Sequence, residues 1–214
     1  NCRYCFRRHF PYQDNKPGRN EWQQALDYIA HDPSITEVIY SGGDPLASSD
    51  KQLLWLTEKI AQIPHVKRLR VHTRLPIVIP DRITDACLQW MTSTRLLPSL
   101  VIHSNHPNEL DTEVADALHR LSRAGITLLN QTVLLSGVND SVETLCQLSE
   151  RLFEMGVLPY YLHQLDRVSG SAHFEVSDQH AKQLITELMA KLPGYLVPRL
   201  VRELPNTPNK MPLP

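Results

Sequence analysis

Two cysteines at the start of the chain have a spacing that suits metal ligands. Cys2 and Cys5 stand three positions apart, and Arg7 and Arg8 follow them. Two thiolates at this spacing can bind one metal centre, but they supply only half of a four-ligand site. We therefore expect the remaining ligands to come from outside this chain or not to be protein. By spacing, His9 is a possible third ligand, and it is equally well explained as a surface residue.

The cysteine pair has two other common interpretations. A zinc knuckle requires a second Cys or His pair at a similar spacing, and a thioredoxin-like redox pair lies between a strand and a helix of a different fold. Neither context accompanies Cys2 and Cys5. The two other cysteines, Cys87 and Cys146, stand inside helical patterns, and the four form no disulfide framework for a chain of this size. Reduced thiols are typical of the cytoplasm, which is the predicted location.

Length and composition predict a globular protein. The 214 residues can bury a substantial core, enough for one domain or a large part of a barrel. A net charge of −1 gives no global sign of a nucleic-acid partner or an anionic membrane surface. No apolar run approaches the roughly 20 residues that span a bilayer, so we expect a soluble protein without a membrane partner. The chain begins at Asn1 without methionine, and we expect its true N-terminus to be missing.

Short apolar runs alternate about six times with longer segments of helical periodicity. Regular alternation of this kind indicates parallel strands joined by helical crossovers, which is an α/β fold with a complete or partial (β/α) barrel. No linker or low-complexity stretch divides the sequence. The predicted strands are 37–41, 68–72, 99–103, 127–132, 158–163 and 195–201. The predicted helices are 21–31, 50–62, 81–91, 112–124, 141–155 and 178–191.

Polar residues gather at the carboxyl ends of the predicted strands. Functional groups of such barrels lie at these ends. Loops that serve only as connections rarely carry such a series, which favours an active site over ordinary turns. In strand order the residues are Ser41, Gly42, Gly43 and Asp44, then His72, Thr73 and Arg74, then His103 and Asn105, then Asn130 and Gln131, then His163, Gln164 and Asp166, and finally Arg202 and Glu203, with Lys210 beyond.

Two of these features also have an ordinary structural explanation. Gly42 and Gly43 let the backbone approach a ligand, and Asp44 can accept a hydrogen bond from an ammonium or hydroxyl group. A tight turn needs no ligand, however, and the Lys and Ser/Thr of a phosphate-binding loop are absent. Lys210 stands among prolines, where a lysine is usually a solvated loop charge. It can instead form a Schiff base with an aldehyde cofactor if its loop reaches the barrel mouth.

The segment 2–8, with the sequence CRYCFRR, resembles the last part of the Cys-x3-Cys-x2-Cys cluster motif of radical S-adenosylmethionine enzymes, in the form found in the lysine 2,3-aminomutase family. The first cysteine of that motif would lie four residues before Cys2. The resemblance continues through segments 41–45, 74–84, 105–109, 130–140, 160–166 and 194–212. Within the family, the chain is most similar to the branch that makes β-lysine for modifying translation elongation factor P.

The resemblance implies a set of ligands for two cofactors of radical chemistry. Cys2 and Cys5 would be two of three thiolate ligands of a [4Fe–4S] cluster, whose open iron binds the amino and carboxylate groups of S-adenosylmethionine. The segment after the first strand would receive the amino group of S-adenosylmethionine, and other strand ends would line the same pocket. The first set is Ser41, Gly42, Gly43 and Asp44, and the second is His103, Asn105, Asn130 and Gln131.

The resemblance also implies a third cofactor and a substrate. Lys210 aligns with the lysine that carries pyridoxal 5′-phosphate. Arg7 matches the residue that clamps the substrate carboxylate, a role suited to a planar guanidinium with two parallel donors. Asp166 matches one of two acids that hold the ε-ammonium of lysine, and Glu203 stands where the other acid lies. Two such acids would favour lysine, because a neutral side chain would leave both desolvated and unpaired.

Three features differ from the fermentative aminomutases. Glu203 replaces an aspartate, residues 206–209 replace a glycine-rich run, and His163 replaces a tyrosine near the cofactor. The first two differences fit the branch that serves elongation factor P.

These resemblances imply a partial (β/α)6 TIM-like barrel of the radical S-adenosylmethionine type in residues 1–204, lacking its first strand. Segment 205–214 would then carry the pyridoxal-phosphate lysine. The implied isomerase moves the α-amino group of L-lysine to C3, and a separate ligase would attach the β-lysine to elongation factor P. The alternatives are a catabolic lysine 2,3-aminomutase and a non-catalytic metal-binding barrel protein.

Overall fold

One curved β-sheet forms the centre of the protein in the computed structural model, which describes residues 2–5, 19–204, 207 and 209–213. Seven strands cross the sheet in the order of the sequence. The first six are parallel, and the last is antiparallel to its neighbour. The strands are β1 (Glu37–Tyr40), β2 (Arg68–Thr73), β3 (Leu97–Ile102), β4 (Thr127–Val133), β5 (Val157–His163), β6 (Arg199–Arg202) and β7 (Met211–Pro212).

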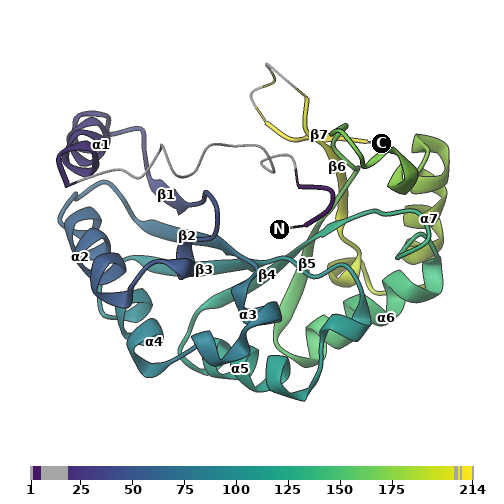
Figure 1. The fold of residues 1–214 in the computed structure, drawn as a ribbon, viewed down its shortest axis with the longest axis horizontal. Coiled ribbons are helices and arrows are strands. Elements are labelled where there is room, and N and C mark those ends of the chain that lie inside the picture. The colour runs from purple at the N-terminus through teal and green to yellow at the C-terminus, as the bar shows by residue number, and fades with distance from the viewer. Residues whose placement is uncertain (1, 6–18, 205–206, 208, 214) are drawn as a thin grey trace.

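Helices follow the outer side of the curved sheet, which forms a half-barrel, while residues 2–5 lie on its inner side (Figure 1). The predicted α/β partial barrel is therefore confirmed. The α-helices are α1 (Arg19–His31), α2 (Asp50–Ala61), α3 (Leu75–Val78), α4 (Asp85–Thr92), α5 (Thr112–Arg123), α6 (Val142–Glu154) and α7 (Asp178–Lys191). Short 3-10 turns are η1 (Pro45–Ala47), η2 (Pro80–Arg82), η3 (Pro107–Glu109), η4 (Ala172–Phe174) and η5 (Gly194–Leu196). Within the described ranges, no helix is both long and apolar enough to cross a membrane.

Side-chain caps fix where the crossover helices begin. The hydroxyl of Ser49 caps α2, the carboxylate of Asp111 caps α5, and the hydroxyl of Ser177 caps α7, each by accepting a hydrogen bond from a backbone N–H in the first turn. Gly125 and Gly156 follow α5 and α6 with φ angles of 82° and 77°. Glycine adopts this left-handed conformation at little cost, so both helices end in time for the next strand to start.

Two predicted boundaries are wrong for local reasons. The predicted helix 81–91 begins at Asp85, because the hydroxyl of Thr84 caps it by accepting from the N–H of Cys87 and the preceding residues form η2. The predicted strand 195–201 begins only at Arg199, because η5 occupies its first residues. The structure also adds α3 and β7, two short elements that hydrophobic periodicity did not indicate.

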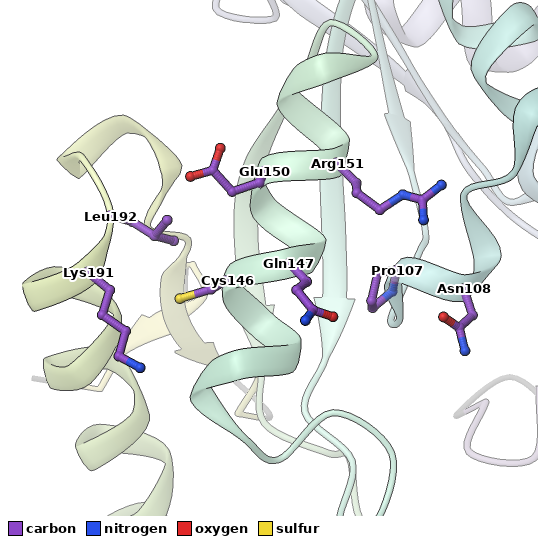
Figure 2. A pocket seen from close by; sticks show the side chains of 8 residues that line it. All are labelled: Pro107, Asn108, Cys146, Gln147, Glu150, Arg151, Lys191 and Leu192. Carbon is purple, nitrogen blue, oxygen red and sulfur yellow. The ribbon is translucent and has the colours of Figure 1, made fainter.

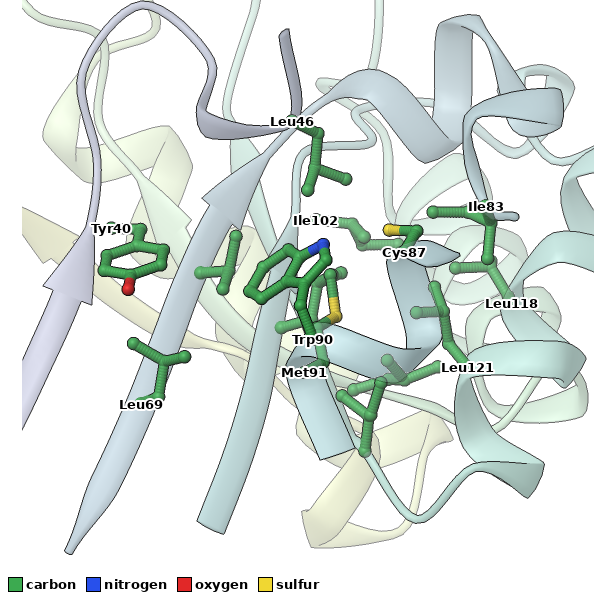
Figure 3. Close-up of a cluster of buried hydrophobic side chains, with 14 of the residues drawn as sticks. Tyr40, Leu46, Leu69, Ile83, Cys87, Trp90, Met91, Ile102, Leu118 and Leu121 are labelled. Carbon is green, nitrogen blue, oxygen red and sulfur yellow. The ribbon is translucent and has the colours of Figure 1, made fainter. Parts of the chain in front are cut away.

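The largest core cluster packs the helices against β1–β4 (Figure 3). Trp90 is fully buried at its centre, and its ring centroid lies 6.2 Å from that of Tyr40 on β1. The indole N–H donates to Asp50 at 3.0 Å, and the Tyr40 hydroxyl pairs with Thr57 at 3.0 Å. Each aromatic ring therefore buries its apolar surface while its polar atom keeps a partner. This packing holds the first strands in place and thus fixes the loops at their carboxyl ends.

An irregularity interrupts β4 in the middle of the sheet. The register against β5 shifts between Asn130 and Gln131. Side chains of a regular strand alternate between two faces, yet Asn130, Gln131 and Thr132 are all buried. A shift of this kind bends the strand and redirects its side chains. Three consecutive polar residues are thereby brought into the protein interior near the strand ends.

The last two strands form a short hairpin. The antiparallel register pairs Val201 with Pro212 and Arg202 with Met211. Continuing the same register places Glu203 opposite Lys210. The hairpin therefore brings the lysine of the C-terminal segment back to the carboxyl end of β6.

Candidate active site

Asp44 ties the loop after β1 to the loop after β2. Its Oδ1 accepts from the Thr73 hydroxyl at 2.6 Å and from the Leu46 N–H at 3.0 Å, and its Oδ2 accepts from the Arg74 N–H at 2.7 Å. The carboxylate is thus held in one orientation by three donors. Gly42, two residues earlier, has a φ of 142°, which favours glycine, and a Cβ there would meet no atom within 4 Å. The backbone of this loop therefore borders open space beside a fixed carboxylate.

The cysteine loop docks onto these strand ends. The Cys5 N–H donates to the Cys2 carbonyl at 3.2 Å, which closes the loop as a turn, and both cysteines are free thiols of intermediate exposure. Nη1 of Arg74 donates to Cys2 Sγ at 2.7 Å and to the Tyr4 hydroxyl at 3.2 Å. The two thiols predicted as metal ligands therefore lie beside the carboxyl end of β2.

Asn105 binds the cysteine loop directly, and Glu109 supports it through Arg74. Glu109 Oε1 accepts from the backbone N–H groups of Asn105 and His106 at 2.6 and 3.0 Å, while its Oε2 pairs with Arg74 at 2.5 Å. The Asn105 side chain donates to the Tyr4 hydroxyl and accepts from the Val133 N–H at 2.9 Å. Arg74 after β2 and Asn105 after β3 thus both bind the four-residue cysteine loop, and the end of β4 holds Asn105 in place.

Tyr4 and Arg74 each influence the other's ionisation. Burial raises the pKa of Tyr4 to about 12, and the nearby Cys2 adds to the rise. Burial alone would lower the pKa of Arg74, but the negative charge that Tyr4, Cys2 and Glu109 can carry outweighs it, so the net shift is upward. At neutral pH the loop is therefore bonded by a permanent cation and a neutral phenol.

Two neighbouring amides on β4 have different surroundings. Asn130 is buried, accepts from the Ser104 N–H at 2.9 Å, and donates to the Ser104 carbonyl at 3.0 Å and to the Thr132 hydroxyl at 2.8 Å. Its amide nitrogen therefore uses both of its hydrogens within the protein. The Gln131 Nε2 is also buried, but no residue that the structure describes accepts from it. A ligand with an oxygen acceptor would satisfy that group.

Three histidines line the same strand ends, on β2, after β3 and on β5. The rings of His72 and His103 lie 6.3 Å apart. Burial lowers the pKa of His103 to about 4, and the charges of Arg74 and Lys210 add to the fall. Burial lowers the pKa of His163 to about 3, with a further contribution from Lys210. Both imidazoles are therefore neutral near pH 7, and the buried Nε2 of His163 has no partner within the described part of the chain.

Lys210 lies at the far side of the site, in the hairpin of β6 and β7. Its ammonium pairs with Glu203 and lies 5.6 Å from the ring centroid of Tyr161. Burial raises the pKa of Asp166, nearby Glu203 raises it further, and Lys210 opposes both effects. Two acids and one ammonium therefore share a small, partly desolvated region. His103 is near enough to Arg74 and to Lys210 for the charges of both to lower its pKa.

The structure brings together most of the predicted site residues. Arg7 and His9 lie outside the described residues, so their predicted roles stay predictions. The sequence assigned no role to Arg74, although it stands at a strand end, or to Glu109. Their contacts join residues 72 and 35 positions apart, and no local pattern can show such contacts.

The two thiols fit a metal centre that is completed from elsewhere. They lie on one turn, are partly exposed and form no disulfide. In the ranges that the structure describes, no group of three or more His, Cys, Asp and Glu side chains could hold a metal ion. A centre bound at Cys2 and Cys5 therefore needs at least one further ligand, as the sequence indicates.

A cavity of about 520 Å³ lies elsewhere, in the outer helical layer (Figure 2). Its lining comes from η3, α6 and the end of α7, and none of the predicted site residues contributes to it. The lining residues are Pro107, Asn108, Cys146, Gln147, Glu150, Arg151, Lys191 and Leu192. The predicted chemistry belongs to the strand ends rather than to this cavity.

Comparison with known proteins assigns most of the chain to one family. The family profile described as Radical SAM superfamily matches residues 1–148. The L-lysine 2,3-aminomutases of Escherichia coli K12 and Haemophilus influenzae are each 54% identical to the chain, over 213 and 210 residues. They match 100% and 98% of the chain, which spans 62% of the length of each. The enzyme of the same name from Clostridium subterminale is 37% identical over 99% of the chain and 51% of its own length.

Solved structures with a similar fold have little sequence in common with the chain. Streptococcus suis SuiB superposes with a TM-score of 0.58 at 11% identity, over 89% of this chain and 44% of SuiB. A radical SAM methyltransferase from Sphaerobacter thermophilus gives a TM-score of 0.53 at 17% identity, over 86% of this chain and 55% of that protein. At such identities the similarity supports the fold alone.

Proposed function

We propose that this chain, which belongs to the radical SAM superfamily, forms the catalytic barrel of a lysine 2,3-aminomutase. The intact protein would be an isomerase that moves the α-amino group of L-lysine to C3. The observation that carries the proposal is 54% identity, over the whole chain, to relatives named for this reaction. The site supports it, because two thiols, a lysine and two acids lie at the carboxyl ends of strands of one sheet. Residues 1–204 would form the barrel, and segment 205–214 would supply the lysine.

Cys2 and Cys5 would hold a [4Fe–4S] cluster together with a third thiolate, and the loop after β1 would hold S-adenosylmethionine. Together these cofactors supply the radical chemistry that removes and returns a substrate hydrogen. The contribution of the chain is placement. Three donors fix the carboxylate of Asp44, and Gly42, two residues earlier, has the positive φ that favours glycine. The pocket would be completed by Ser41, Gly43, His103, Asn105, Asn130 and Gln131.

Lys210 would carry pyridoxal 5′-phosphate. When bound, this cofactor would supply a conjugated ring that delocalises electrons from the position of the migrating nitrogen. Nζ of Lys210 donates to Glu203, and the ammonium of this ion pair has no lone pair with which to attack a carbonyl group. Loading of the cofactor therefore requires Lys210 to leave Glu203. After that departure, the carboxylate of Glu203 no longer pairs with Lys210, at the moment when the site needs an anion for the substrate. The same acid would serve Lys210 before loading and the ε-ammonium of substrate lysine afterwards.

Asp166 and Glu203 would select lysine by charge. Burial and Glu203 raise the pKa of Asp166, so a bound cation relieves an unfavourable arrangement of two neighbouring acids. A substrate without an ε-ammonium would leave that arrangement in place, and the site would discriminate against it. Arg7 would hold the carboxylate of the substrate at the other end.

The β-lysine would serve a ligase that modifies elongation factor P in the cytoplasm. Glu203 and the non-glycine residues 206–209 support this role, because they resemble the branch of the family that does so. Four free thiols fit a reducing compartment.

The test of the activity uses the intact protein that contains this chain, reconstituted anaerobically with iron, sulfide and pyridoxal 5′-phosphate and assayed with S-adenosylmethionine and a one-electron reductant. We expect β-lysine from L-lysine, seen by mass spectrometry after derivatisation, and none from norleucine, which lacks the ε-ammonium. A protein that binds metal but makes no β-lysine would be the non-catalytic alternative. Expression in cells lacking their own aminomutase separates the two pathways, since a catabolic enzyme would leave elongation factor P unmodified.

A further inference from the structure

Arg74 joins three segments that are distant in the sequence. Nη1 donates to Cys2 Sγ at 2.7 Å, Nη2 pairs with Glu109 Oε2 at 2.5 Å, and the backbone N–H donates to Asp44 Oδ2 at 2.7 Å. The residue thus touches the cysteine loop, the η3 turn and the loop after β1. Its guanidinium is the charged group in direct contact with a thiol that would bind a metal centre.

The position of this guanidinium is fixed by its surroundings. Glu109 Oε1 is already held by two backbone N–H groups, those of Asn105 and His106, so Oε2 cannot move far. The side chains of Arg74 and Glu109 are only 28% and 23% exposed. A partly buried charge is screened less by water and salt than a surface charge. The field of Arg74 at the sulfur is therefore both oriented and strong.

We infer that Arg74 is a positioning residue that raises the reduction potential of the cluster through its hydrogen bond to the Cys2 sulfur. Reduction adds one electron, supplied by an external donor, to a centre that its thiolates already make negative. A cation and an N–H donor at a ligating sulfur stabilise the added charge more than they stabilise the oxidised state. The inference rests on the proposed function, because it requires a cluster at Cys2.

Glu109 should act in the opposite direction. Its carboxylate neutralises part of the charge of Arg74 and stands close behind it. Removing the negative charge while keeping the side-chain shape leaves Arg74 with a greater net positive effect on the sulfur. An arginine that merely anchored the loop would give no such pair of opposite shifts.

The experiment is a redox titration of the cluster in the intact, reconstituted protein without S-adenosylmethionine, followed by the electron paramagnetic resonance of the reduced cluster. The variants are Arg74→Gln and Glu109→Gln. The matched control is Arg120→Gln, which removes a guanidinium from α5 in the outer layer, where Arg120 pairs with Asp85. Iron and sulfide contents are measured first, so that only loaded protein is compared.

We expect Arg74→Gln to lower the equilibrium constant for cluster reduction about tenfold, which is about 59 mV for one electron. We expect Glu109→Gln to raise the potential and Arg120→Gln to leave it at the wild-type value. An unchanged potential in loaded Arg74→Gln protein would overturn the inference. Should Arg74→Gln fail to load, Glu109→Gln decides, and an unchanged or lowered potential there overturns it. Wild-type protein that holds no cluster would instead count against the proposed function.

Discussion

The two sides of the site differ in how fully their polar groups are bonded. At the ends of β1–β4, the side chains of Asp44, Asn105 and Asn130 each make several hydrogen bonds within the protein. From Gln131 on β4 towards β7, the buried Nε2 atoms of Gln131 and His163 have no partner among the described residues, and the pKa of Asp166 is raised. The cysteine side is already organised, whereas the lysine side still contains groups that a ligand would satisfy.

This difference separates two kinds of contribution to function. A hydrogen-bonded network holds loops in one arrangement and contributes to the stability of the fold. A buried group with no partner is unfavourable until a ligand arrives, and functional sites commonly carry such groups at the expense of stability. Substitutions on the cysteine side should therefore reduce stability, while substitutions on the lysine side should reduce turnover or binding. Four measurements test this contrast.

The largest expected effect is that of Lys210→Ala on the lysine side. We expect β-lysine formation to fall by about 10³-fold or more, because the anchoring amine is lost, and pyridoxal phosphate to be lost on gel filtration. The free energy of unfolding should change by less than about 1 kcal/mol, since the ion pair with Glu203 is partly exposed. Lys182→Ala, on the exposed face of α7, is the control. Full activity of Lys210→Ala protein would refute the assigned role.

A substitution on the cysteine side should have the opposite profile. Asn130→Ala removes hydrogen bonds to both backbone groups of Ser104 and to Thr132 and leaves them buried. We expect the cofactor-free protein to lose about 3 kcal/mol of unfolding free energy in urea denaturation. Asn108→Ala, at an exposed position on η3, should lose far less. Equal losses from the two variants would contradict the contrast between the two sides.

Asp166→Asn tests the charge selection of lysine. We expect KM for lysine to rise about 30-fold with a smaller change in kcat, because a partly buried partner of the ε-ammonium loses its charge. The raised pKa of Asp166 adds a pH dependence, since the wild-type carboxylate is protonated as pH falls and KM should then rise. The rise of KM at low pH should be smaller in Asp166→Asn protein than in the wild type. It should be retained in the control Asp116→Asn, whose position is exposed. A wild-type KM in the variant would exclude Asp166 from the substrate pocket.

The smallest effect concerns the buried histidine of β5. The pKa of His163 is about 3 in the folded protein, below the usual 6.5. Between these two pH values the unfolded chain therefore binds more protons at this residue than the folded protein does. His163 therefore leaves stability intact above pH 6.5 and reduces it as pH falls towards 3, by up to about 1.4 kcal/mol per pH unit. We expect His163→Asn to reduce the slope of unfolding free energy between pH 6 and 5. The same substitution at the exposed His31 is the control, and identical slopes in both variants would contradict the assignment.

Regular elements were predictable from the sequence because their causes are local. Apolar periodicity placed the parallel strands, although η5 shortens the last of them. The start of α4 was placed at 81 rather than Asp85, because Asp81 and Thr84 are both polar residues near a proline and only one caps the helix. The strand β7 has two residues, too few for any period to be visible.

Site residues were predictable to the extent that strand ends and family resemblance mark them. Contacts between segments that are distant in the sequence were not predictable in this way. The docking of Cys2 on Arg74 depends on how far β2 extends and on where Glu109 holds the guanidinium, and both follow from packing rather than from spacing. The bulge in β4 is another such case, since it gives Asn130 and Gln131 different roles although they are neighbours in the chain.

The register of the terminal hairpin carries a consequence for how this protein can evolve. Because Glu203 and Lys210 face each other through the pairing that joins Arg202 to Met211, their meeting depends on the number of residues between them. Inserting or deleting one residue there would turn the lysine side chain towards the other face of the hairpin. The length of the intervening sequence is therefore constrained by this pairing, so alignments of functional descendants should show no gaps at 204–209.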